Sequence, residues 1–325
     1  MSQSFIRNEK SPSFQISRQP PFKLNQLSIC EDVVADPEDE EPLERDELPW
    51  LKDPNAKISF WTIIKDSIGK GDISKMSVPV YFNDPTSLLQ KQACGMEYND
   101  ILDIAANESD PLKRIALIAV HQISSMSMVE KIATKPFNPL LGETFEFVTP
   151  KFQYLAEQVS HHPPITACYC RGKDYTWYTN STTNTSFNGK MLKVTNVYRQ
   201  YYHFDKFNQT YEVQPPILSA HNLIIGTMYI DIGDTMTIIN LDKQNEKCEV
   251  KFERRSWFSN EAFKLTGEAF TEQGKTKNVV YTIEGNWDRQ CTIVNTVTKD
   301  KHQAWVKSPY PERVAHMYGM AKFHI

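Results

Sequence analysis

The chain has 325 residues, of which 40% are hydrophobic and 23% charged, and these proportions are those of an ordinary globular protein. The formal net charge of -4 gives no overall reason to expect a nucleic-acid partner. No run approaches the roughly 18 to 20 apolar residues that cross a bilayer, and the six scattered cysteines form no CxxC pair, so we expect a reduced cytoplasmic protein.

Residues 1–44 are expected to form a disordered tail, because prolines recur in them and apolar periodicity does not. The overlapping stretch 31–47 holds ten acidic residues and one arginine. Two interpretations remain open for this stretch. It is either a solvated linker or a docking motif for a membrane-anchored partner.

From residue 56 onwards apolar residues recur at regular spacings. Ile58, Trp61, Ile64 and Ile68 recur at spacings of three and four residues, which predicts a short amphipathic helix. The segment 69–71 (GKG) ends it and lacks the GxxxxGK[ST] spacing of a phosphate-binding loop.

Two further helices are predicted over residues 86–106 and 111–131. Pro111 stands at a natural first helical position, and an apolar stripe follows it at Ile115, Ile118 and Ala119, continuing to Gln122.

Beyond Pro139 the pattern becomes that of strands, with alternating and aromatic-rich runs separated by turns rich in Gly, Asn and Asp. So many short strands without intervening helices predict a large antiparallel barrel or sandwich. The predicted strands are 144–148, 153–159, 165–170, 176–179, 190–198, 223–232, 235–241, 248–253, 262–269, 279–287 and 291–298.

The most unusual segment is EQVSHHPP at 157–164. Adjacent residues of a strand point to opposite faces, so His161 and His162 can reach one ligand only where the strand ends. The two prolines that follow end it there, because proline cannot donate to a ladder. Paired imidazoles can donate hydrogen bonds to a phosphate. A metal site is the rival interpretation, although no supporting ligand spacing and no HExxH accompany the pair, and a purely structural role is a third.

A second constellation is KPFNPLLGE at 135–143. Its two prolines restrict the backbone, so that a stiff loop presents Lys135 and Asn138. A lysine and an amide on one loop suit a phosphate or a polar headgroup. The alternative is a rigid turn that leads into the first strand.

Together these two segments resemble the paired signature of the oxysterol-binding-protein-related lipid-binding domain. Flanking phrases are similar to the family as well, namely 46–49 (DELP), 60–65 (FWTIIK), 71–76 (GDISKM), 79–85 (PVYFNDP) and 317–319 (MYG). The resemblance covers about residues 45–325.

The resemblance implies a mainly β fold with flanking helices (α+β). In it a large antiparallel β barrel, at about 140–300, surrounds a hydrophobic lipid tunnel. Helices lie at about 86–131, and an N-terminal lid lies at about 58–78. The lid residues that face the bound lipid or the membrane are Trp61, Ile64, Ile68, Ile73 and Met76.

The implied function is non-enzymatic binding and intermembrane transfer of lipids, with a sterol or phosphatidylserine exchanged against phosphatidylinositol 4-phosphate. The protein would be cytoplasmic, peripheral on membranes and without a cofactor or metal. Position by position, Lys135 and Asn138 would contact headgroup phosphates, and His161 and His162 would clamp the 4-phosphate. No catalytic residue is expected, since no GxSxG elbow is present.

The sequence differs from the family pattern in two places. Family members continue past the segment matching 318–325 into a helical part that supplies a further lysine and arginine, so we expect a shortened C-terminal part with fewer cations. The family's acidic docking motif for an endoplasmic-reticulum adaptor carries two aromatics, whereas 32–38 has Val33 and Val34. The alternative function is a lipid sensor or scaffold that binds lipid and a protein partner without net transport.

Overall fold

The computed structural model describes residues 83–127, 135–187, 191–222, 229–255 and 263–309. A short parallel pair opens this part of the chain, formed by β1 (Asn83–Ser87) and β2 (Lys135–Phe137). The predicted lid and the acidic tail lie outside the described residues.

The helices follow β1 as α2 (Leu88–Ala93), the 3-10 turn η4 (Cys94–Met96), α3 (Asp100–Asn107) and α4 (Pro111–Met126). The range 86–106, expected to be one helix, is therefore divided. The division falls at a glycine-containing turn, Cys94–Met96, and glycine is a poor helix former. Asp110 caps α4 by accepting hydrogen bonds from the amides of Leu112 and Lys113, and Pro111 occupies the first turn as predicted.

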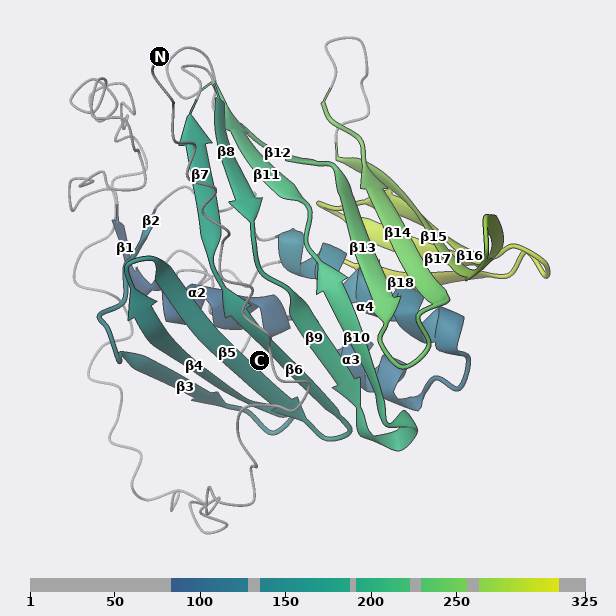
Figure 1. The fold of residues 1–325 in the computed structure, drawn as a ribbon, viewed down its shortest axis with the longest axis horizontal. Coiled ribbons are helices and arrows are strands. Elements are labelled where there is room, and N and C mark those ends of the chain that lie inside the picture. Colours follow the sequence, from purple (N-terminus) through teal and green to yellow (C-terminus); the bar gives the residue numbers. More distant parts are fainter. Residues whose placement is uncertain (1–82, 128–134, 188–190, 223–228, 256–262, 310–325) are drawn as a thin grey trace, which may run out of the picture. The chain divides into compact units, whose positions relative to one another are not determined.

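Helix α4 is the centre of the core. Thirteen of its sixteen residues are buried, which is typical of a helix enclosed by other elements. It packs against β13 to β18, whereas α2 packs against β3 and β4, and α3 packs against β6. Figure 1 shows the helices together on one side of the large sheet.

That sheet holds twelve strands in the order β18-β17-β16-β15-β14-β13-β10-β9-β6-β5-β4-β3, and its neighbours pair antiparallel. The bounds are β3 (Thr144–Val148), β4 (Phe152–His161), β5 (Pro164–Gly172), β6 (Tyr175–Ser181), β9 (Gln200–Phe204), β10 (Gln209–Gln214), β13 (Thr235–Asn240), β14 (Glu246–Phe252), β15 (Lys264–Gln273), β16 (Thr276–Asn286), β17 (Gln290–Asn295) and β18 (Lys301–Val306). Burial alternates along many of them, and the buried side chains face the helices.

A four-stranded sheet, in the order β12-β11-β8-β7, continues the middle of the large one. Its strands are β7 (Thr183–Phe187), β8 (Met191–Asn196), β11 (Ile217–His221) and β12 (Tyr229–Gly233). Strand β7 follows β6, β8 precedes β9, β11 follows β10, and β12 precedes β13. A short break separates each pair, such as Pro215–Pro216 between β10 and β11. Proline removes a ladder donor, so the sheet is interrupted there.

The predicted mainly β, antiparallel fold with helices on its N-terminal side is confirmed. Among the described strands, β3 and β18 stand at the two ends of the sheet order and do not pair with each other. Closure of the predicted barrel is therefore not seen in this part of the chain.

A buried arginine ties the start of α4 to the sheet. The Arg114 side chain donates hydrogen bonds to the Glu108 carbonyl (Nη2 at 2.7 Å), to Gln209 (2.7 Å) and to the Tyr211 hydroxyl (2.9 Å). Its guanidinium carbon lies 3.4 Å from the ring centroid of Phe207. These neutral oxygens and the aromatic face satisfy a cation that is 1% exposed, and they fix the α3–α4 connection.

Candidate functional site

The histidine pair lies at the tip of the β4–β5 hairpin. His161 is the last residue of β4 and pairs with Pro164, the first residue of β5, so the strand ends at the place that the two prolines predicted. The ring centroids of His161 and His162 are 4.6 Å apart with an interplanar angle of 64°, and both residues are exposed. The tip therefore presents two adjacent imidazoles to solvent.

The loop of the second motif lies against the same hairpin. The amide of Gly142 donates to the carbonyl of Gln158 (2.9 Å), and the amide of Gln158 donates to the carbonyl of Glu143 (3.0 Å). Pro139 is buried and anchors the loop, whereas Asn138 is exposed. The structure places the backbone of Lys135 in β2 and does not describe its side chain. Three of the four predicted headgroup residues thus have described side chains, and all three are exposed.

Gln158 was not among the site residues predicted from the sequence. It is 2% exposed, and its side-chain amide donates to the carbonyl of Ser160 (2.8 Å) while its oxygen accepts from the hydroxyl of Thr166 (2.7 Å). Because these bonds span the irregular register between Gln158 and Ser160, they hold the end of β4 against β5. These contacts lie directly before His161 and His162 in the chain. One feature of the sequence could have indicated this residue. Gln158 is a polar residue at an inward-facing position of a strand whose other inward-facing residues are Phe152, Tyr154 and Ala156.

A second buried polar cluster lies between α4 and the sheet. The side chains of Gln122 and Gln200 exchange two hydrogen bonds (2.8 and 3.0 Å), and the Trp177 indole donates to Gln200 (2.9 Å). Gln122 also donates to Tyr202, whose hydroxyl lies 3.1 Å from Nδ1 of His121. Burial lowers the pKa of His121 to about 3, so the cluster is uncharged at neutral pH. The sequence pattern placed Gln122 in the apolar stripe of the helix, and nothing in that pattern indicates the hydrogen bonds that Gln122 makes.

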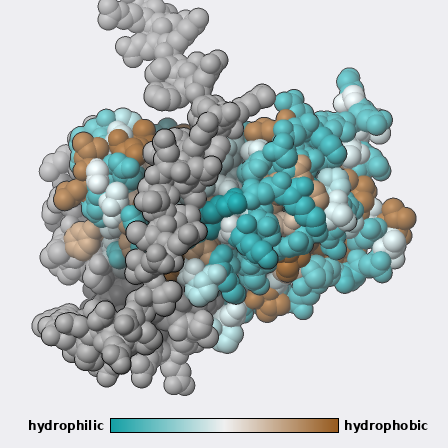
Figure 2. Space-filling view, turned by 90° about the horizontal axis from the view of Figure 1, so that it is seen from below, coloured by the Kyte–Doolittle hydropathy of each residue, from teal (hydrophilic) through white to brown (hydrophobic). Residues whose placement is uncertain are grey.

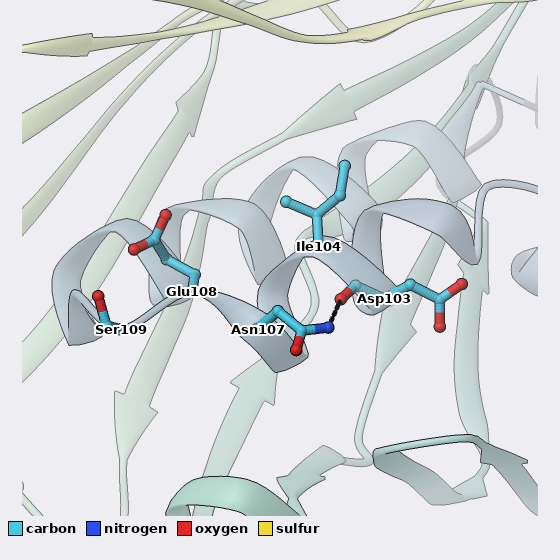
Figure 3. A pocket seen from close by; sticks show the side chains of 5 residues that line it. All are labelled: Asp103, Ile104, Asn107, Glu108 and Ser109. Atoms are coloured by element: carbon cyan, nitrogen blue, oxygen red, sulfur yellow. Dashed lines mark hydrogen bonds between the residues drawn. The ribbon is translucent and has the colours of Figure 1, made fainter.

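A surface hollow of about 500 Å³ lies elsewhere, at the connection between α3 and α4. It is lined by Asp103, Ile104, Asn107, Glu108 and Ser109 (Figure 3). The Asn107 amide donates to the Asp103 carbonyl at 3.0 Å, which is an ordinary bond within the helix end. None of these residues belongs to the predicted site, and we assign no ligand to the hollow.

The remaining predicted site residues are Trp61, Ile64, Ile68, Ile73 and Met76, and all five lie outside the described residues. In the part of the chain that the structure describes, no group of three or more His, Cys, Asp and Glu residues could hold a metal ion. No described helix is both long enough and apolar enough to span a membrane.

Solved structures with a similar fold carry lipids. The structure of the Osh1 ORD domain in complex with cholesterol superposes with a TM-score of 0.75 at 26% sequence identity, covering 85% of this chain and 70% of that one. The structure of Osh3 ORD from Saccharomyces cerevisiae in complex with PI(4)P has a TM-score of 0.72 at 25% identity, covering 86% of this chain and 72% of that one.

Relatives in sequence agree with this fold. Oxysterol-binding protein homolog 2 of Saccharomyces cerevisiae is 34% identical over 79% of this chain, and oxysterol-binding protein 2 of Mus musculus is 33% identical over 82%. The alignments cover 20% and 31% of those two relatives, so the chain spans a minor part of their length. The family model described as oxysterol-binding protein matches residues 59–325. With this match and the hairpin geometry, the chain belongs to the oxysterol-binding protein family.

Proposed function

We propose that this chain binds one lipid at a time and transfers lipids between membranes, exchanging a sterol, or alternatively phosphatidylserine, against phosphatidylinositol 4-phosphate. The observation that carries the proposal is the pair of adjacent, exposed imidazoles on a hairpin tip that Gln158 holds in place. Solved relatives in complex with cholesterol and with PI(4)P support both ligand classes.

The hairpin tip suits a phosphate monoester. Two imidazole rings inclined by 64° direct their ring nitrogens along different lines, so that they can approach different oxygens of one phosphate. Hydrogen bonds between a protonated imidazole and a phosphate are charge-assisted and stronger than neutral ones. Both rings are exposed, so that a headgroup in a membrane can reach them.

The adjacent loop adds donors of a second kind. Asn138 is exposed on the segment between β2 and β3, and the amide of Gly142 ties that segment to the carbonyl of Gln158. In this proposal Asn138 and Lys135 contact the headgroup phosphates, while the acyl chains or the sterol are covered by apolar residues. Burial of apolar lipid surface, worth about 25 cal/mol per Å², supplies most of the affinity.

The proposal is tested by extraction of lipids from vesicles. The protein is incubated with phosphatidylcholine vesicles that hold either phosphatidylinositol 4-phosphate or a labelled sterol, and the lipid withdrawn into the soluble fraction is measured. The variant His161→Ala with His162→Ala should lose phosphatidylinositol 4-phosphate extraction by at least about tenfold, which corresponds to about 1.4 kcal/mol, and should still extract sterol. Withdrawal of neither lipid by the wild-type protein would contradict the proposal.

A sensor that binds lipid without net transport stays the alternative. Vesicle-to-vesicle transfer separates the two functions, because a sensor extracts lipid in stoichiometric amounts but does not deliver it catalytically. The acidic stretch 31–47 offers a second test, by deletion. If its removal abolished binding of a protein partner and left transfer unaffected, the sensor function would gain support.

A further inference from the structure

Exposed apolar side chains gather beside the histidine pair. Nine large hydrophobic residues are exposed in the described part of the chain, and four of them belong to the two motifs. These four form what we call the apolar lip: Phe137 (43% exposed), Leu140 (73%), Leu141 (67%) and Val159 (46%). The hydrogen bonds between Gly142, Glu143 and Gln158 place the loop residues of the lip next to Val159 and the end of β4.

The lip is built on a rigid turn. The amide of Glu143 donates to the carbonyl of Leu140 (3.0 Å), which closes a four-residue turn, and Gly142 has the positive φ of 79° that the third position of a type II turn requires. The carboxylate of Glu143 accepts from the amide of Leu140 (2.9 Å) and is thereby held by the backbone. The turn therefore leaves two adjacent leucines exposed and holds the Glu143 carboxylate against its own backbone.

Other surfaces of the described part look different. In Figure 2 most of the coloured surface is hydrophilic, and hydrophobic residues form separate groups at its left end, along its lower edge and at its right end. The remaining exposed hydrophobics are spread over distant segments, for example Val297 between β17 and β18 and Ile104 on α3. Contiguous exposed apolar groups mark interaction sites, whereas single ones need no explanation.

We propose that the apolar lip inserts into the surface of a phospholipid bilayer and thereby places the histidine pair at the level of the lipid headgroups. This inference rests on the proposed function, because a protein that withdraws a lipid must contact the membrane at the end where the headgroup is held. The lip and the histidines share that end of β4. Apolar side chains that enter the boundary between headgroups and acyl chains bind in proportion to the apolar area they bury there.

Vesicle flotation tests the proposal directly. The variant Leu140→Asn with Leu141→Asn is compared with the wild-type chain and with Val297→Asn, a matched exposed residue away from the lip. On vesicles of phosphatidylcholine alone, the double variant should bind on the order of tenfold or more weakly, because each leucine loses apolar burial. Val297→Asn should bind like the wild type, and salt should leave the wild-type binding unchanged. Equal flotation of the double variant and the wild type would overturn the proposal.

Sterol uptake from a cyclodextrin complex separates this inference from the proposed function, since it needs no membrane. The double variant should take up sterol normally while it fails to float. If neither protein took up sterol and only the wild type floated, the lip would stand and the proposed function would fall.

A fluorescent label identifies what covers the lip. An environment-sensitive probe is attached at Leu141→Cys in a Cys30→Ser background, where the five described cysteines are buried. Its emission should shift to the blue only after vesicles are added. A blue-shifted emission without vesicles would mean that the chain's own residues 58–78, or a second copy of the chain, cover the lip, and the proposal would be wrong.

Discussion

Replacement of Gln158 by leucine tests the positioning of the histidine pair. The change keeps the size of the buried side chain but removes its hydrogen bonds to Ser160 (2.8 Å) and from Thr166 (2.7 Å). Each such bond contributes about 1 kcal/mol net, and the Thr166 hydroxyl, in a residue that is 2% exposed, would lose its acceptor at a further cost of about 1–3 kcal/mol. We expect the free energy of unfolding to fall by about 2–4 kcal/mol.

The assay is urea unfolding, followed by phosphatidylinositol 4-phosphate binding under native conditions. Gln153→Leu is the control, because Gln153 lies on the same strand but is exposed, and it should change stability by less than about 0.5 kcal/mol. Adding Thr166→Val to Gln158→Leu removes the orphaned hydroxyl and should restore about 1–2 kcal/mol.

Phosphatidylinositol 4-phosphate binding should depend on how firmly the end of β4 is held. Loosening the end of β4 should weaken phosphatidylinositol 4-phosphate binding on the order of tenfold, while sterol uptake should not change, since the sterol has no phosphate for the tip to hold. If Gln158→Leu left both stability and phosphoinositide binding unchanged, the positioning role of Gln158 would be refuted.

Three further predictions concern the core. Arg114→Met should lower the free energy of unfolding by about 3 kcal/mol or more in urea, because it leaves the Glu108 carbonyl without the two guanidinium nitrogens that donate to it. His121 should make stability depend on pH. Its pKa is about 3 in the folded state and about 6.5 in the unfolded state, so its contribution is complete above about pH 6.5 and is lost towards pH 3 by about 1.4 kcal/mol per unit. His121→Gln should flatten that slope between about pH 6.5 and 5, and an unchanged slope would exclude His121. Burial raises the pKa of Cys168 to about 12, so a thiolate-specific reagent should modify it at least about tenfold faster in urea than in the native protein; equal rates would contradict its burial.

Much of the sheet could be predicted because its strands alternate in polarity. Residues 144–148 were predicted as a strand and form β3 with those bounds. Strand β9 was missed because large aromatic residues occupy both of its faces. Tyr202 is fully buried, whereas Tyr201 points outward and stacks on Tyr178 at 5.1 Å, so no polar period is visible. Strands β7, β10, β11 and β18 were not predicted either.

The helical region shows a different limit. One helix was expected over 86–106, and the chain instead turns at Cys94–Met96, where Gly95 weakens the helix and tertiary contacts hold the turn. Tyr98, between η4 and α3, is buried and packs edge-on against Trp305 at 5.5 Å, a contact with β18 near the other end of the described chain. No pattern in the neighbouring sequence predicts this contact with Trp305. A turn in this place follows from packing, which overrides a weak helix propensity.

The position of the two histidines could be predicted from the sequence, but the hydrogen bonds that hold the end of the strand could not. Two prolines after a strand-like run placed His161 and His162 at a strand end, and the structure has them there. The roles of these histidines, and those of Lys135 and Asn138, stay predictions. The hydrogen bonds of Gln158 could not be read from the sequence, because they depend on a register irregularity between β4 and β5.

Competition between the two ligands tests the proposed exchange most directly. The protein is loaded with a fluorescent sterol, and phosphatidylinositol 4-phosphate is titrated from vesicles while sterol release and bound lipid are both measured. One-site exchange predicts that one phosphatidylinositol 4-phosphate is taken up for each sterol released, and that His161→Ala with His162→Ala abolishes the release. Simultaneous retention of both lipids, or full release by the double variant, would contradict it.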